Sequence, residues 1–169
     1  MSIAEHQGPP VLHWRNAIGD FILAFGGCEY WTHAYIRKFG PQVIHEVAAK
    51  MEITSRAALA KAIVLDKAAS TELKRRIEMI FKSFSSLTKC RNLVAHNVPS
   101  FMSQQIMVGV DLKMHIVSPQ KKGSLTLKAL QQHVIQAETL LHDMEALYLA
   151  IRPPHPGKPK AVFSDGKSG

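Results

Sequence analysis

The sequence predicts a mainly α fold, a helical bundle with a small β-hairpin inserted before the last long helix. Three observations predict this fold. Apolar residues recur at steps of three and four over several stretches, as on the buried face of an amphipathic helix. Glycine and proline residues separate these stretches. One later segment has two short runs typical of strands around a turn. With 169 residues, the chain is long enough for one domain with its own core.

The first long helix is expected from about Leu12 to Phe39, where a Gly-Pro pair follows. A short leader, residues 1–10, precedes it. The adjacent Gly26 and Gly27 lower the stability of this helix, so we expect either the close approach of another helix or a ligand contact there. The expected buried face comprises Trp14, Ile18, Phe21, Ile22, Phe25, Cys28, Trp31 and Tyr35.

Three further helices are expected before residue 97. Pro41 can open a short helix that ends at about Met51, and Thr54 or Ser55 is the expected N-cap of the next one, which runs to about Lys67. Ser70 or Thr71 is the expected N-cap of the fourth. The expected buried positions are Ala57, Leu59, Ala60, Ile63 and Val64 in the third helix, and Leu73, Ile77, Ile80, Phe81, Phe84 and Leu87 in the fourth.

The β-hairpin is expected to comprise Gln105–Val110 and Lys113–Val117, joined at Asp111-Leu112. Thr126 is the expected N-cap of the last helix, Leu127 to about Ile151, whose buried stripe is Leu130, Val134, Ala137, Leu141, Met144 and Leu149. The predicted organisation is therefore a leader (1–10), a single helical domain (11–151) and a tail rich in proline, glycine and lysine (152–169), which we expect to be mobile.

The charge of the chain is strongly basic, +8 with histidine neutral. This favours phosphate-rich partners such as RNA, because neutralised phosphates release counterions; the alternative is that the charge serves only solubility. Four basic residues on the fourth helix form a candidate RNA-backbone patch, for which a solvated helix surface is the alternative. They are Lys74, Arg75, Lys82 and Lys89.

The two cysteines, Cys28 and Cys90, form no CxxC pair and are expected to be small buried side chains. The N-terminus lacks the features of a secretion signal. The most apolar stretch, residues 17–31, is too short to span a bilayer and contains two acids. We therefore expect a cytoplasmic protein without a membrane partner. No metal-ligand spacing or glycine-rich phosphate loop is present in the sequence, so no metal or cofactor is expected.

The segment Arg91-Asn92-Leu93-Val94-Ala95-His96 carries the chemistry. With Asn after Arg, Ala before His and apolar residues between, near the end of an amphipathic helix, it resembles the RNxxAH motif of the HEPN family. The order of the helices is also similar. The resemblance implies a metal-independent endoribonuclease that acts as a homodimer, possessing Arg91 and His96 as catalytic residues and Asn92 as a polar helper. It also implies a toxin–antitoxin or phage-defence setting, with an antitoxin or regulatory protein as a further partner.

The motif's geometry points the same way. Residues five apart on an α-helix lie about 140° apart, so Arg91 and His96 cannot both project from one face. Either the helix loosens near His96 or a second copy of the motif completes the site. Histidine can take the 2′-hydroxyl proton or supply one to the leaving oxygen, and arginine can stabilise the phosphate charge. We therefore expect cleavage by 2′-hydroxyl attack.

Other functions stay open from the sequence. Arg91 can simply pair with a carboxylate of the first helix such as Glu29, which is also the candidate orienting residue, while His96 closes the end of its helix. Proteins similar to the mannitol-operon repressor carry an Arg-Asn…Ala-His segment too, which suggests a non-catalytic regulator. An accessory subunit that binds RNA or a nucleotide is the third reading. Val98 stands where some HEPN toxins have a modifiable tyrosine, which argues against that mode of neutralisation.

Overall fold

Five α-helices build the described part of the chain. The computed structural model describes residues 9–96, 100–101, 114–117 and 124–151, and side-chain burial for 12–96 and 125–151. The helices are α1 (Pro9–Phe39), α2 (His45–Lys50, after the 3-10 turn Gln42–Ile44), α3 (Ile53–Lys67), α4 (Thr71–His96) and α5 (Leu127–Ala150). The mainly α helical bundle predicted from the sequence is confirmed.

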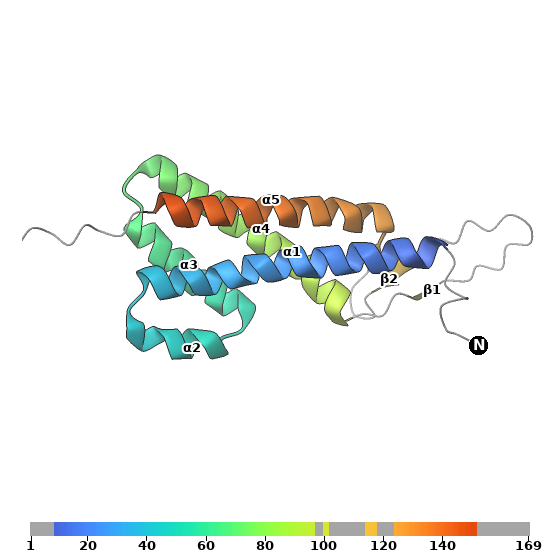
Figure 1. Ribbon diagram of the computed structural model, residues 1–169, viewed down its shortest axis with the longest axis horizontal. Coiled ribbons are helices and arrows are strands. Elements are labelled where there is room, and N and C mark those ends of the chain that lie inside the picture. Colours follow the sequence, from blue (N-terminus) through green and yellow to red (C-terminus); the bar gives the residue numbers. More distant parts are fainter. Residues whose placement is uncertain (1–8, 97–99, 102–113, 118–123, 152–169) are drawn as a thin grey trace, which may run out of the picture.

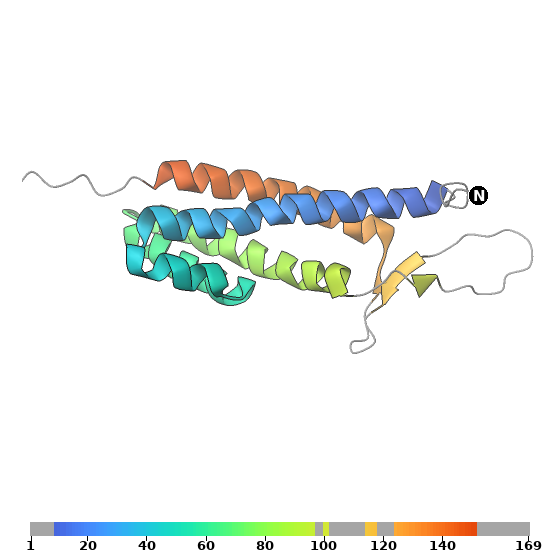
Figure 2. The same ribbon diagram turned by 60° about the horizontal axis from the view of Figure 1, so that its bottom comes forward.

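The three long helices lie side by side along the molecule (Figures 1 and 2). α1 and α5 run in the same direction, because residues in step along both helices meet: the Cys28 thiol lies 3.5 Å from the Ala137 carbonyl and the Tyr35 hydroxyl donates to the Met144 carbonyl at 2.6 Å. α4 runs opposite to both, and α3 fills the space between α1 and α4. The C-terminal half of α1 therefore faces the end of α4 where the motif lies.

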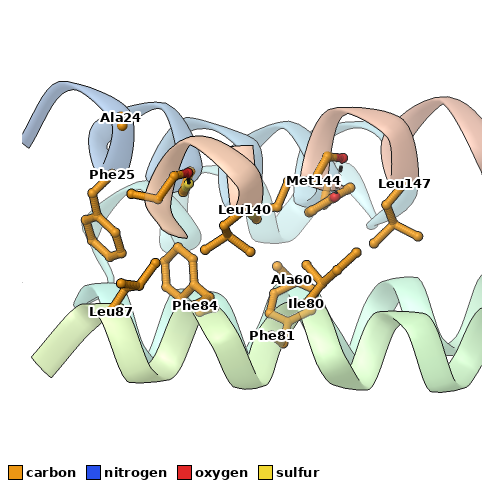
Figure 3. Close-up of a cluster of buried hydrophobic side chains, with 14 of the residues drawn as sticks. Ala24, Phe25, Ala60, Ile80, Phe81, Phe84, Leu87, Leu140, Met144 and Leu147 are labelled. Atoms are coloured by element: carbon orange, nitrogen blue, oxygen red, sulfur yellow. Dashed lines mark hydrogen bonds between the residues drawn. The ribbon is translucent and has the colours of Figure 1, made fainter. Parts of the chain in front are cut away.

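The core lies where α1, α3, α4 and α5 meet. Figure 3 shows aromatic side chains of α1 and α4, such as Phe25 and Phe84, meeting Leu140 and Met144 of α5. The predicted buried face of α4 is confirmed from Ile77 to Leu87. Two predicted core residues are wrong: Ile22 is 38% and Leu149 71% exposed. In α5 the buried stripe includes instead Leu140, Leu147 and Ile151.

Glycine in α1 has the packing role expected at one of its two adjacent positions. A methyl group at Gly27 would lie 2.8 Å from Cδ1 of Leu141, so the missing side chain allows α5 to approach. At Gly26 a methyl group would meet nothing within 4 Å. Cys28 and Cys90 are free and buried, as predicted.

Several helix boundaries differ from those predicted. α1 begins at Pro9 rather than Leu12, because proline is tolerated in the first turn, where amide hydrogens have no intrahelical acceptor; the predicted leader therefore loses its last two residues to the helix. The second helix is split into a 3-10 turn and α2. Neither Thr54 nor Ser55 caps α3, which begins at Ile53 after Glu52 with no side-chain cap.

The predicted caps of α4 and α5 are present. The Ser70 hydroxyl accepts from the Leu73 amide and that of Thr126 from the Ala129 amide, both at 3.1 Å. These bonds satisfy amides that the first turn of a helix leaves free. α5 ends at Ala150, with Ile151 as its C-cap.

Short antiparallel strands lie between α4 and α5. They are β1 (Ser100–Phe101), β2 (Met114–Val117) and β3 (Ser124–Leu125), in the order β1-β2-β3. β2 coincides with the predicted second hairpin strand, whereas the predicted first strand, Gln105–Val110, and its turn lie outside the described residues, as do residues 1–8 and the tail 152–169. No helix in the described part has the length and apolarity needed to cross a membrane.

Candidate functional site

The motif occupies the last turns of α4, and the helix stays regular through His96. Of the two alternatives posed by the sequence, loosening of the helix near His96 is therefore not observed. Arg91 and His96 consequently keep their angular separation of about 140°. Arg91 turns toward α1, whereas the His96 side chain is exposed to solvent. Within one chain, the two residues face different surroundings.

Arg91 is held from two sides. Its Nε lies 3.6 Å from Oε1 of Glu29 in α1, and its Nη1 donates to Oδ1 of Asn92 at 3.3 Å. The pairing of Arg91 with Glu29 that the sequence allowed is thus present. The Arg91 side chain remains 34% exposed, so its guanidinium is both fixed and accessible. An arginine in this condition has free donors for an oxyanion.

A second arginine shares the same carboxylate. Nη2 of Arg56 in α3 lies 3.7 Å from Oε2 of Glu29. The same guanidinium donates to Oγ1 of Thr32 at 3.1 Å and to the Met51 carbonyl at 3.0 Å. Arg56 is only 7% exposed, and among the residues of described burial it is the one buried charged side chain. It therefore fixes Glu29 from the interior while Arg91 contacts it from the rim.

The electrostatic balance of this cluster is positive, since one carboxylate faces two guanidinium groups. His33 follows one turn after Glu29 on α1. Burial, together with the positive charges of Arg56 and Arg37, lowers the pKa of His33 below its ordinary value of 6.5. His33 is thus held neutral near pH 7. A cluster with surplus positive charge in a partly buried setting favours an anion at its open side, beside Arg91.

The predicted RNA-backbone patch is spread along α4. Lys74, Arg75, Lys82 and Lys89 are all exposed. The first two lie about 33 Å from His96 along the helix axis, at 1.5 Å per residue, whereas Lys89 lies about 10 Å from it. The patch therefore has a near part, Lys82 and Lys89, that approaches the motif, and a far part that does not.

Arg56 and Thr32 are the site residues that were not predicted. The signal was present in the spacing: Arg56 stands four residues before the buried Ala60, and Thr32 stands four after Cys28. Both thus lie on stripes that the apolar periodicity marks as buried. Polar residues on such stripes require buried partners, and these two partner each other.

A metal centre has no support in the described residues, where no three His, Cys, Asp or Glu side chains are grouped so as to hold an ion. Comparison with protein-family models, curated proteins and solved structures gave no match for this chain. The functional argument therefore depends on the residues of the site themselves.

Proposed function

We propose that this protein is a metal-independent endoribonuclease of the HEPN type that acts as a homodimer. The observation that carries the proposal is the state of Arg91. Its guanidinium is fixed by Glu29 and Asn92, is one-third exposed, and belongs to the same rigid helix as an exposed His96. Preorganised donors of this kind act most strongly on charge that develops in a transition state.

The reaction follows from the chemistry of these two side chains. His96 accepts the proton of an RNA 2′-hydroxyl, and the 2′-oxygen forms a bond to the adjacent phosphorus. The bond from phosphorus to the 5′-oxygen breaks, and that oxygen takes a proton from an acid. The products are a 2′,3′-cyclic phosphate and a 5′-hydroxyl. Arg91 stabilises the added negative charge on the phosphate oxygens.

A second copy of the chain supplies what one copy lacks. Because Arg91 and His96 point about 140° apart, one phosphate cannot easily contact both in a single chain. Two motifs facing each other bring Arg91 of one copy near His96 of the other. They also provide two histidines, one as base and one as acid. A toxin or phage-defence role, with an antitoxin or regulatory partner, is part of this proposal.

The first experiment incubates the pure protein with total RNA in excess EDTA. His96→Ala and Arg91→Ala are tested beside it, with His142→Ala, an exposed histidine of α5, as the matched control. All four are first compared by circular dichroism. We expect cleavage with 2′,3′-cyclic phosphate ends by the wild type and the control alone. Activity per molecule should rise with protein concentration as the dimer forms. Cleavage that requires a divalent ion, or that survives His96→Ala, contradicts the proposal.

The second candidate is a non-catalytic regulator or an RNA- or nucleotide-binding accessory subunit. The ion pair between Arg91 and Glu29 favours it, because this pair also has a purely structural use in joining α4 to α1. In that case, no folded sample cleaves RNA, even with individual tRNAs as substrates. Arg91→Ala then lowers the stability of the fold without removing an activity.

A further inference from the structure

One face of α4 carries a continuous row of polar and charged residues that ends at the motif histidine. We call this row the α4 stripe; its members, all exposed, are Lys74, Glu78, Lys82, Ser85, Lys89, Asn92 and His96. At about 100° per residue, every member lies within roughly 40° of His96 around the helix axis. Arg91 lies outside the stripe. The stripe is therefore a surface distinct from the Glu29–Arg56–Arg91 cluster, and it meets the motif only at Asn92 and His96.

A groove runs beside the stripe, between α3 and α4. Its volume is about 700 Å³, and its lining includes Lys82, Ser85 and Lys89 from α4 and Thr54 and Lys61 from α3. The apolar part of the lining comes from buried or small side chains. The groove thus places hydroxyl and ammonium groups along one edge of an apolar channel.

The charges along the groove are unequal. Glu78 is its acid, and the Lys61 ammonium pairs with that carboxylate at 2.5 Å. Within the described part of the chain, neither Lys82 nor Lys89 takes part in an ion pair. Two unneutralised ammonium groups therefore face solvent at the groove, spaced by two helical turns, and a ligand with repeated negative charges complements them.

We propose that the α4 stripe binds the backbone of single-stranded RNA and leads it to His96. The proposal deepens the ribonuclease function above and rests on it. Proteins that bind single strands track the backbone with a positively charged groove, and Lys82 and Lys89 supply that charge here. From Lys82 to His96 the stripe extends about 21 Å along the axis, enough for several nucleotides. The ribose next to the bound phosphates then lies beside His96, whose ring takes the 2′-hydroxyl proton.

Binding is tested apart from cleavage, in the full chain carrying His96→Ala. The probe is a fluorescein-labelled 12-nucleotide oligouridylate, followed by anisotropy between 50 and 200 mM salt. The test variant is Lys82→Gln with Lys89→Gln. The matched control is Lys50→Gln with Lys128→Gln, two exposed lysines of α2 and α5, which removes the same charge elsewhere. Circular dichroism verifies that each is folded.

We expect the test variant to bind roughly tenfold more weakly at 50 mM salt and the control to bind within about twofold of the parent. Each lost phosphate contact on a single strand lowers the slope of log K against log salt by about 0.7. The slope of the test variant should therefore fall by about 1.4. Equal weakening of test and control overturns the proposal, as does an unchanged slope. Tighter binding of a duplex RNA of equal length, or no RNA binding by the parent, overturns it too.

The two proposals fail in different ways. If the protein with His96 restored cleaves RNA, and the Lys82 and Lys89 substitutions leave that cleavage unchanged at limiting substrate, the stripe proposal is wrong and the ribonuclease stands. If the stripe variants lose RNA binding but the protein with His96 cleaves nothing, the stripe is supported as a binding surface. The ribonuclease proposal is then wrong.

Discussion

Replacing Arg56 with methionine tests the charge cluster most directly. The side chain of methionine has a similar length and can fill much of the same buried space, so the main loss is the guanidinium. That group makes hydrogen bonds to Thr32 and to the Met51 carbonyl and an ion pair with Glu29. At 7% exposure, Arg56 makes these interactions largely out of water.

The expected cost is about 2–4 kcal/mol in the free energy of unfolding. A hydrogen bond to a charged group contributes about 1.5–3 kcal/mol, and such contributions add incompletely. Removing one member of a fully buried ion pair costs about 3–5 kcal/mol because the other charge is stranded. That penalty is reduced here, since the Glu29 side chain is 26% exposed and keeps Arg91 as a partner.

The assay is urea unfolding followed by circular dichroism, with Arg56→Lys and Arg56→Met measured beside the wild type. Lysine keeps the charge but not the planar set of donors, so its midpoint should lie between the other two. A cycle with Glu29→Gln isolates the coupling between Arg56 and Glu29. A loss below about 1 kcal/mol for Arg56→Met at an unchanged m-value would refute the reasoning, because three buried contacts of a charged group would then contribute almost nothing.

Three further predictions concern α1 and the thiols. Gly26→Ala should stabilise the fold by about 1 kcal/mol through helix propensity, whereas Gly27→Ala should not, because its methyl group meets α5 at 2.8 Å; equal gains in urea unfolding contradict this packing. The lowered pKa of His33 means that the unfolded chain binds its proton more readily, so this residue's contribution to stability falls as pH drops through and below 6.5. His33→Gln should lose less stability than the wild type between pH 7.5 and 5, and parallel losses argue against the shift. Burial raises the pKa of the Cys28 thiol to about 12 and that of Cys90 to about 11, so a thiol-specific disulfide reagent at pH 8 should label both only after unfolding. Rapid labelling of the native protein by either thiol would show that it is more accessible than its burial indicates.

The periodicity of the sequence was a good guide to the helices but a weaker guide to their ends and to the edges of their buried faces. α3 lacks the side-chain cap predicted at Thr54 or Ser55 because its N-terminus begins one or two residues earlier, after Glu52. In α5, Leu149 is exposed although Leu147 and Ile151 are buried. A drift of two residues places a side chain about 200° away around the helix, and only the neighbouring helices decide which leucine they cover.

The sequence by itself determined that the chain forms a mainly α bundle, that Arg91 and His96 stand on one helix, and that a straight helix separates them in angle. These properties are local, since they depend on residue spacing and on the period of the α-helix. Only the tertiary structure decided that Glu29 is shared by Arg91 and Arg56 and that a groove lies beside Lys82 and Lys89. Those contacts join residues far apart in the chain, and the way in which α1, α3 and α4 bury their apolar faces against one another sets which polar side chains meet at their rims.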